Sequence, residues 1–436
     1  MVKLRHLRKT GNSVLLRNIA ARVAALACVF VATLVLARNG GPAVVGIYAL
    51  LHVLPGLLGT IVSSGLPVAV PYFLAGPDRE DVRLPSTLVA MAVAGGVAGS
   101  ALWVASAPVV GPLLFPDLSL PLVMLAGTAV LTRLGTITAK ACSQGSDDLP
   151  GSNRVIFTEE FMFLPSYGLL SVAGLHSFAA VVGALLLAEA VTASLAWARL
   201  ARRNFFRTAT RPSLQLARRV ASYGFRAQVG GVITQLNLRL DFVVLTLMTG
   251  PAVLGIYAVA SKFAELIRIL GMALTYVFYP KFAKDGRSQA LENARRLLPK
   301  AALLTAGLLV PLWLASGFAI PAFYGSDFDS AVTPARIILL GLALDGVAGV
   351  ISAFLYGVGR PGLNSLAMAA GLVATVVLDL LLIPPFETVG AAIASAIAYL
   401  TSALALVAFF WWLGRSDRAV LWEQERLSSA SSADAG

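Results

Sequence analysis

The sequence predicts an all-α integral membrane protein with twelve transmembrane helices, arranged as two six-helix repeats (an N-lobe and a C-lobe) around a central cavity. Three observations lead to this fold class: long apolar stretches recur from end to end, a ten-residue sequence occurs twice, and the cations gather in alternate loops. Of the 436 residues, 58% are hydrophobic and 13% are charged, and the mean hydropathy is +0.81. Soluble domains carry about twice that share of charge. We therefore expect most of the chain to lie in a bilayer.

Twelve apolar stretches approach or exceed the roughly 20 residues that a helix needs to cross a bilayer. They cover approximately residues 14–37, 43–74, 84–107, 120–143, 155–173, 177–199, 219–248, 251–283, 296–320, 333–357, 361–383 and 388–412. Six spans in each half give both halves the same orientation in the membrane. Parallel repeats of this kind place a path across the membrane between the two halves.

A repeated sequence supports the division into two halves. Residues 41–50 read GPAVVGIYAL and residues 250–259 read GPAVLGIYAV, which are identical at eight of ten positions. The sequence PGSN at 150–153 returns as PGLN at 361–364, at almost the same offset. Two matches in the same order indicate a duplicated half rather than chance similarity.

The repeat and the spans together predict five segments. A basic cytoplasmic N-terminus (1–13) precedes the N-lobe (14–199), and an Arg-rich cytoplasmic linker (200–218) leads to the C-lobe (219–412). The tail (413–436) ends in a run of Ser, Ala, Asp and Gly, a composition that favours disorder.

Lysines and arginines are concentrated on one predicted side of the membrane. That side holds 24 of the 34, whereas the opposite side holds only Arg38. The positive-inside rule then predicts a multi-pass protein of the cytoplasmic membrane with both termini in the cytoplasm. We expect the Arg-rich linker to lie along anionic membrane lipids. The net charge of +12 does not indicate a nucleic-acid partner, because no basic domain with interleaved aromatic residues remains outside the spans.

Nine cations and seven acids fall inside the predicted spans. A charge at the centre of a bilayer costs roughly 2.5–3.5 kcal/mol even on lenient scales, so most of them should face each other or a hydrated cavity. The cations that we expect to line the cavity are Arg22, Arg133, Arg239, Lys262 and Arg268. A cationic path suits an anionic substrate, and guanidinium groups match phosphate in geometry. The alternative for the charges near helix ends is snorkelling to the interface.

Helical spacing sorts the polar residues of the seventh and eighth spans. Gln235 and Arg239 share one face of the seventh, while Asn237 and Asp241 share the opposite face. Glu265 lies between two of the cavity cations on the eighth span, where it could form a structural bridge with Lys262. Asp241 and Glu265 are the candidates for coupling to an ion gradient.

Motifs for cofactors, metals and catalysis are missing. Cys28 and Cys142 fall inside apolar spans and the three histidines are scattered, so neither a disulfide framework nor a metal site is expected. The string GVGRPG at 357–362 has the spacing of a dinucleotide motif, but it joins two apolar spans rather than a strand and a helix. We expect no cofactor and no enzymatic activity.

Motifs at equivalent places in the two halves resemble a known family. They are Leu16-Arg17-Asn18, Leu36-Ala37-Arg38, Gly41-Pro42 and Gly46-Ile47-Tyr48-Ala49 in the first half, and Asn237, Asp241, Gly250-Pro251, Gly255-Ile256-Tyr257-Ala258 and Pro280 in the second. The pattern is similar to the polysaccharide-unit (Wzx-like) flippases of the multidrug/oligosaccharidyl-lipid/polysaccharide (MOP) exporter superfamily. The resemblance implies a flippase that moves a polyprenyl-pyrophosphate-linked oligosaccharide to the outer leaflet. It also implies polysaccharide polymerase or export proteins as partners.

Two other functions remain open from the sequence. A multidrug or organic-cation antiporter has the same scaffold, although a cationic drug would favour an acidic or aromatic cavity. A membrane polysaccharide polymerase or ligase belongs to a different class, and such an enzyme needs a larger outer loop than the sequence contains.

Overall fold

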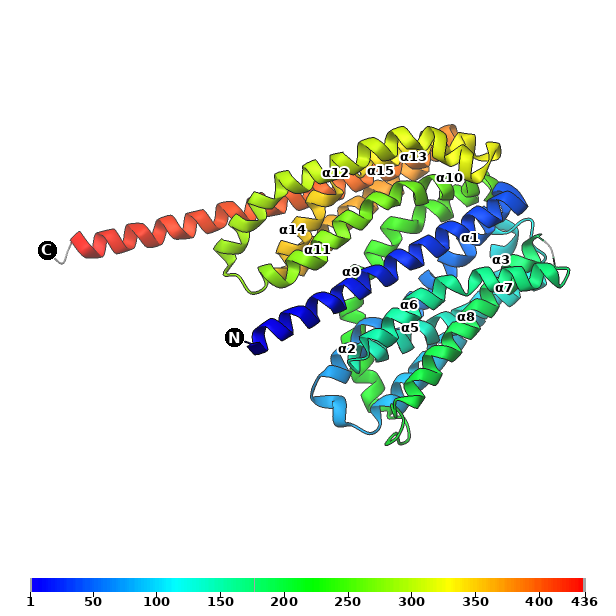
Figure 1. Cartoon of the computed structure of the whole chain (residues 1–436), viewed down its shortest axis with the longest axis horizontal. Helices are drawn as coiled ribbons and strands as arrows, with labels where there is room; N and C mark the ends of the chain where they lie inside the picture. Colours follow the sequence, from blue (N-terminus) through cyan, green and yellow to red (C-terminus); the bar gives the residue numbers. More distant parts are fainter. Residues whose placement is uncertain (1, 176, 434–436) are drawn as a thin grey trace. The chain divides into compact units, whose positions relative to one another are not determined.

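The computed structural model describes the backbone of residues 2–175 and 177–433, and side chains between Arg17 and Arg415 except those of residues 19, 77, 176 and 177. Every regular element in this part of the chain is a helix (Figure 1). The first half contains α1 (Val2–Val62), α2 (Leu66–Ala75), η1 (Pro77–Glu80), α3 (Leu84–Leu114), α4 (Leu120–Ala126), α5 (Ala129–Gly145), α6 (Leu149–Phe161), α7 (Phe163–Val172) and α8 (Ser177–Arg202). The second contains α9 (Leu214–Thr249), α10 (Pro251–Ala264), η2 (Glu265–Ile267), α11 (Arg268–Phe282), α12 (Arg287–Tyr324), η3 (Ser326–Ala331), α13 (Val332–Gly341), α14 (Asp345–Gly357) and α15 (Pro361–Ala433).

The helices form two compact units. The first contains the residues up to Val259 together with Pro321–Phe328, and the second contains Ala260–Ile320 and the residues from Asp329 onward. Helix α9 and the first part of α10 thus pack with the N-terminal helices, although the repeat places them in the second half. The expected lobes, separated by the linker at 200–218, follow the sequence repeat rather than these packing units. The lobe boundaries therefore stay a prediction.

Helix α1 reverses direction at Gly41, where φ is 68° and ψ is −169°. Asn18 donates a hydrogen bond to Asn153 of α6 at 2.8 Å, and the ring of Tyr48 lies 4.8 Å from that of Phe163 at the start of α7. A straight helix would separate residues 18 and 48 by about 45 Å, whereas residues 153 and 163 are about 15 Å apart along α6 and α7. The contacts therefore require two antiparallel segments.

Helix α15 also reverses, at Glu387, where φ is 49° and ψ is −122°. A Cβ built on Gly390 would lie 3.0 Å from the backbone nitrogen of Ile383, although a straight helix would hold these residues about 10 Å apart. Pro384 and Pro385 precede the break and remove two backbone donors from the helix.

The end of α15 extends through the segment for which the composition predicts disorder. The helix continues to Ala433, and the last three residues lie outside the described part. No proline interrupts the chain after residue 385, so nothing in the local sequence forces the helix to stop.

Eight helices of the described chain are long and apolar enough to cross a membrane, or nine if the bent pair Ser326–Gly341 and Asp345–Gly357 counts as one span. The predicted count of twelve is therefore not confirmed. The difference arises because α1 and α15 each join two predicted spans, and because the predicted span 251–283 is divided into α10, η2 and α11. The all-helical, multi-span character of the protein is confirmed.

Large apolar side chains point outward on the long helices. On α12, Leu303 is 75% exposed, Leu314 64% and Phe318 80%. Contiguous apolar surface of this kind is unfavourable in water and is typical of helices that contact lipid. Separate buried cores hold each unit together, one including Phe73, Leu88 and Cys142 and the other including Phe282, Phe354 and Phe410.

The two copies of the repeated sequence pack against each other within the first unit. A Cβ on Gly46 would lie 2.8 Å from the carbonyl carbon of Pro251, and a Cβ on Gly255 would lie 2.7 Å from that of Pro42. Each glycine thus permits the close approach of the proline at the start of the other copy. This reciprocal contact explains why both copies contain a glycine five residues after the first one.

Candidate functional site

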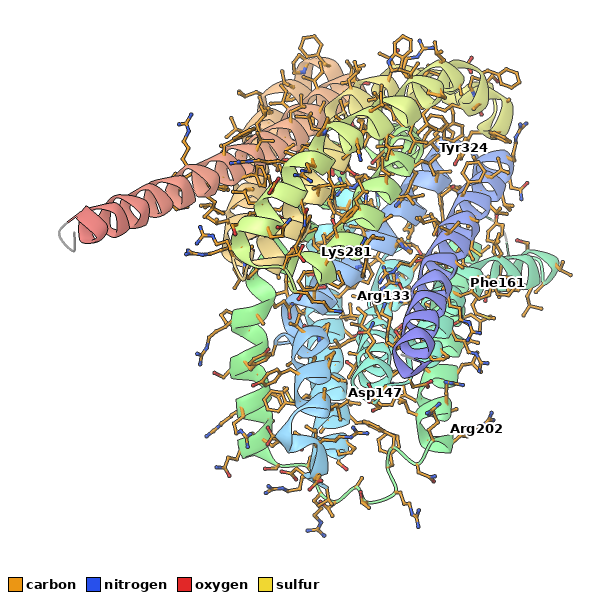
Figure 2. The ribbon with its side chains drawn as sticks, turned by 60° about the vertical axis from the view of Figure 1, so that its left-hand side comes forward. Arg133, Asp147, Phe161, Arg202, Lys281 and Tyr324 are labelled. Atoms are coloured by element: carbon orange, nitrogen blue, oxygen red, sulfur yellow. The ribbon has the colours of Figure 1, made fainter. Side chains whose placement is uncertain are left out.

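A cluster of charged side chains lies inside the first unit, which we call the Arg133 cluster: Arg133 and Lys140 of α5, Glu159 of α6 and Glu189 of α8. Arg133 Nη1 lies 3.1 Å from Glu159 and also donates a short hydrogen bond to Glu189, while Lys140 Nζ lies 3.2 Å from Glu159. The two glutamates are at most 10% exposed. Figure 2 shows Arg133 between the two ends of this unit, with Asp147 and Arg202 towards one end and Tyr324 towards the other.

Helical spacing and chain topology assemble this cluster. Residues 133 and 140 are seven positions apart, so both project from one face of α5, and Glu159 lies between them. Glu160, the next residue of α6, faces His52 of α1, with 3.8 Å between carboxylate oxygen and ring nitrogen. Two cations therefore meet three carboxylates in this region. The positive charge that the sequence places at Arg133 is compensated by acids, and a cationic cavity is not confirmed there.

Arg22 occupies a different environment, beside the amide groups of two asparagines. Its Nε donates to Asn18 Oδ1 at 3.1 Å, and Asn18 in turn donates to Asn153 of α6. The guanidinium is half-buried, and the groups in these two hydrogen bonds are neutral amides.

The two faces predicted for α9 differ as the spacing indicates. Asn237 is 5% exposed and Asp241 1%, and Asp241 accepts a hydrogen bond of 2.6 Å from the hydroxyl of Tyr257 in the second copy of the repeat. Gln235, in contrast, is exposed, and Arg239 is half-buried with its guanidinium 5.3 Å from the ring centre of Phe242. Asp241 thus anchors α10 to α9, which is a structural role.

The remaining predicted site residues belong to the second unit. Lys262 Nζ lies 3.2 Å from Glu265, three positions along the helix, which is the structural bridge that the spacing allows. The guanidinium of Arg268 lies 5.3 Å from the ring centre of Tyr399 in α15. Arg268 therefore stands over an aromatic face, as Arg239 does, and it also interacts electrostatically with Asp345 of α14.

A family model described as polysaccharide biosynthesis protein matches residues 15–285, well over half of the chain. The chain belongs to this family. This polysaccharide biosynthesis protein is 21% identical over 193 residues to a protein of Haloferax volcanii described as the probable low-salt glycan biosynthesis flippase Agl15. The alignment covers 43% of the chain and 41% of that relative, so the chain spans less than half the length of the curated relative that it matches.

Solved structures with a similar fold are flippases and transporters. The lipid II flippase MurJ in its inward closed conformation has a TM-score of 0.76 and 15% identity, over 90% of this chain and 86% of that one. An inward-facing multidrug resistance MATE transporter of the MOP superfamily has a TM-score of 0.70 and 14% identity, over 93% and 96%. The family match identifies a member of the polysaccharide biosynthesis protein family, and the solved structures show that its fold is shared with flippases and transporters.

Sequence reasoning missed two features of this family member. It did not connect Arg133 with Glu159 and Glu189, because the partners lie 26 and 56 positions away and helical spacing relates only residues on one helix. It also missed Asp148, which accepts hydrogen bonds from Arg199 at 2.7 and 2.8 Å and ties the start of α6 to the end of α8. These hydrogen bonds hold the pKa of Asp148 below its usual value.

Proposed function

We propose that this MOP-superfamily protein is a flippase that moves a polyprenyl-pyrophosphate-linked oligosaccharide from the cytoplasmic to the outer leaflet for cell-surface polysaccharide synthesis. The observation that carries the proposal is the match of residues 15–285 to the polysaccharide biosynthesis protein family. The resemblance of the fold to a lipid II flippase supports the proposal, because the name of that protein describes the flipping of a lipid. The relatives found are flippases or transporters, which fits a protein that is not an enzyme.

The proposed topology has twelve crossings with both termini in the cytoplasm. The reversals at Gly41 and Glu387 support this count, since each converts one long helical element into two antiparallel segments. A helix of 43 residues such as Ala20–Val62 would extend about 65 Å if straight, roughly twice the 30 Å hydrocarbon core. The concentration of 24 cations on one predicted side supports the orientation.

The phosphate-binding residues in this proposal are Arg22, Arg239 and Arg268, which lie beside amide or aromatic groups. Arg22 donates a hydrogen bond to Asn18, and the guanidinium groups of Arg239 and Arg268 lie over the rings of Phe242 and Tyr399. Arg133 and Lys262 are each paired with glutamate, so we assign them a structural role in holding their units together. The polyprenyl chain would remain in lipid while the charged head group crosses.

Leaflet-resolved detection of lipid-linked glycan in cells depleted of the protein tests the proposal. A flippase of this specificity leaves its substrate in the cytoplasmic leaflet when it is removed, and surface polysaccharide falls. Re-expression of the wild-type chain restores both. An unchanged leaflet distribution in depleted cells would contradict the proposed substrate.

A multidrug antiporter is the second candidate, and the fold similarity to a MATE transporter favours it. The excess of carboxylate in the Arg133 cluster and its neighbour Glu160 is also compatible with a cationic substrate. Drug sensitivity of a deletion strain separates the two: an antiporter lowers the sensitivity of wild-type cells, whereas a glycan flippase leaves it unchanged and affects the surface polysaccharide.

A further inference from the structure

A large cavity lies between α2 and α9 in the first unit, near the start of α9. Its volume is about 1100 Å³, slightly above the roughly 300–1,000 Å³ that small-molecule sites occupy. We call it the α2–α9 cavity. Its lining combines arginines, tyrosines and uncharged polar groups, and none of these residues belongs to the site predicted from the sequence.

One wall of the α2–α9 cavity is a single face of α9. Gln215, Arg218, Ser222 and Arg226 follow one another at intervals of three or four residues, which places them in a row along the helix. Arg226 donates a hydrogen bond of 2.8 Å to Ser222 Oγ. Within the described residues, neither Arg218 nor Arg226 forms an ion pair, so two positive charges about 12 Å apart along the helix face the cavity.

Arg219 differs from its two neighbours because it is held by an acid. Its Nη2 donates to both carboxylate oxygens of Asp78 in η1, at 2.8 Å each, and its guanidinium lies 5.9 Å from the ring centre of Phe73. This ion pair closes one side of the cavity and links η1 to α9. It leaves Arg218 and Arg226 as the cations available to a ligand.

Two tyrosines form an aromatic surface in the same cavity. The rings of Tyr72 and Tyr223 stack with their centres 4.2 Å apart and their planes inclined by 15°. Tyr72 is 54% exposed and Tyr223 36%, so part of this aromatic surface remains accessible. An exposed aromatic face can contact the apolar C–H face of a sugar ring, and the phenol hydroxyls can bond to its hydroxyl groups.

The walls of the cavity are held in place by a close backbone contact. A Cβ on Gly224 would lie 2.6 Å from the carbonyl oxygen of Ser64 and 2.8 Å from the carbonyl carbon of Gly65, in the turn that precedes α2. One turn further along α9, Gln228 accepts a hydrogen bond of 3.1 Å from Ser63. These contacts fix α9 against the start of α2, so the arginines and the tyrosines are preorganised relative to one another.

We propose that the α2–α9 cavity binds the phosphorylated sugar of a lipid-linked glycan in the cytoplasmic leaflet, before it enters the transport path. The pyrophosphate contacts Arg218 and Arg226, and the first sugar lies against Tyr72 and Tyr223. This inference rests on the proposed function and on its orientation, in which the Arg-rich linker that precedes α9 is cytoplasmic. The position suits such a ligand because the linkage between phosphate and sugar lies at the membrane surface while the polyprenyl chain stays in lipid.

Binding to the full-length protein in nanodiscs tests the cavity directly. The probe is farnesyl-pyrophosphate-linked N-acetylglucosamine, with farnesyl pyrophosphate as the sugar-free comparison and phosphatidylglycerol as the phospholipid competitor.

We expect Arg226→Gln to weaken both farnesyl probes about tenfold, because a charge-assisted hydrogen bond to phosphate is lost. Tyr72→Leu should weaken the sugar-bearing probe alone, and Tyr72→Phe should retain most of its affinity. Arg207→Gln, in the linker and outside the cavity, is the matched control and should have no effect.

Several results would overturn the inference. Equal affinity of the wild type and Arg226→Gln for both probes would remove the arginine wall from binding, and equal loss of both probes in Tyr72→Leu would remove the sugar contact. Displacement of the sugar-bearing probe by equimolar phosphatidylglycerol would make the cavity a phospholipid site. If depleted cells still show the leaflet defect while the variants bind normally, the flippase proposal stands and only the cavity inference fails.

Discussion

Replacement of Gly46 by alanine tests whether the reciprocal contact between the two repeat copies determines the packing of the first unit. The new Cβ would lie 2.8 Å from the carbonyl carbon of Pro251, whereas ordinary van der Waals contact begins at 3.4 Å. The carbonyl oxygen of Pro251 lies closer still to the new Cβ, so the two backbones must separate by more than the 0.6 Å difference between these distances. Because the obstacle is backbone rather than a flexible side chain, it cannot rotate away.

The expected cost is about 1–3 kcal/mol of unfolding free energy, the range for overpacking a tight interface. Gly255→Ala should cost a similar amount, since its Cβ would meet the carbonyl carbon of Pro42 at 2.7 Å. The double variant should cost less than the sum of the two, because one separation of the backbones relieves both clashes.

Reversible unfolding in mixed detergent micelles measures these differences. Gly59→Ala is the matched control: this glycine lies in the second segment of α1 and a Cβ there meets nothing within 4 Å, so alanine should stabilise the helix by about 0.5–1 kcal/mol. The reasoning is refuted if Gly46→Ala behaves like Gly59→Ala, or if the losses at the two repeat positions are fully additive.

Three further predictions concern charged residues. Glu159→Gln should destabilise the protein by about 3 kcal/mol or more, because two half-buried cations lose their shared, buried carboxylate. Thermal unfolding in micelles measures this loss. Asp148→Asn should lower stability at neutral pH, because the hydrogen bonds from Arg199 depress the pKa of Asp148 in the folded protein. The contribution of the carboxylate to stability is present above its ordinary pKa of 3.8 and is lost as the folded-state carboxylate protonates. The difference between variant and wild type should therefore fade as the pH drops below 3.8. Arg239→Ala and Arg268→Ala should each reduce glycan translocation about tenfold with normal protein levels, as expected for loss of one charge-assisted contact with phosphate.

Matched controls separate these effects from general sensitivity to charge removal. Glu292→Gln breaks an exposed ion pair with Arg296 on α12, which should change stability by less than about 1 kcal/mol. Equal effects of Glu159→Gln and Glu292→Gln would contradict the assignment of the Arg133 cluster as a buried structural network. Unchanged surface glycan in the Arg239 and Arg268 variants would remove both from the transport mechanism.

The sequence by itself determined the properties that depend on local pattern. Apolar composition identified a helical membrane protein, and the repeated GPAV sequence marked equivalent places in two halves. Helical spacing placed Gln235 and Asp241 on opposite faces of α9, and the structure shows that the face of Asp241 is the buried one. Each of these inferences uses only composition or a fixed number of residues per turn, so neighbouring helices do not alter it.

Only the tertiary structure decided which groups surround each charged side chain in the predicted spans. Arg133 and Arg268 are both cations in apolar spans, yet Arg133 meets two glutamates from other helices and Arg268 stands over the ring of Tyr399 in α15. The same holds for the α2–α9 cavity, whose tyrosines lie 151 positions apart. The physical reason is that the energy of a charge in a membrane protein depends on the groups within a few ångströms of it, and those groups come from helices distant in the chain.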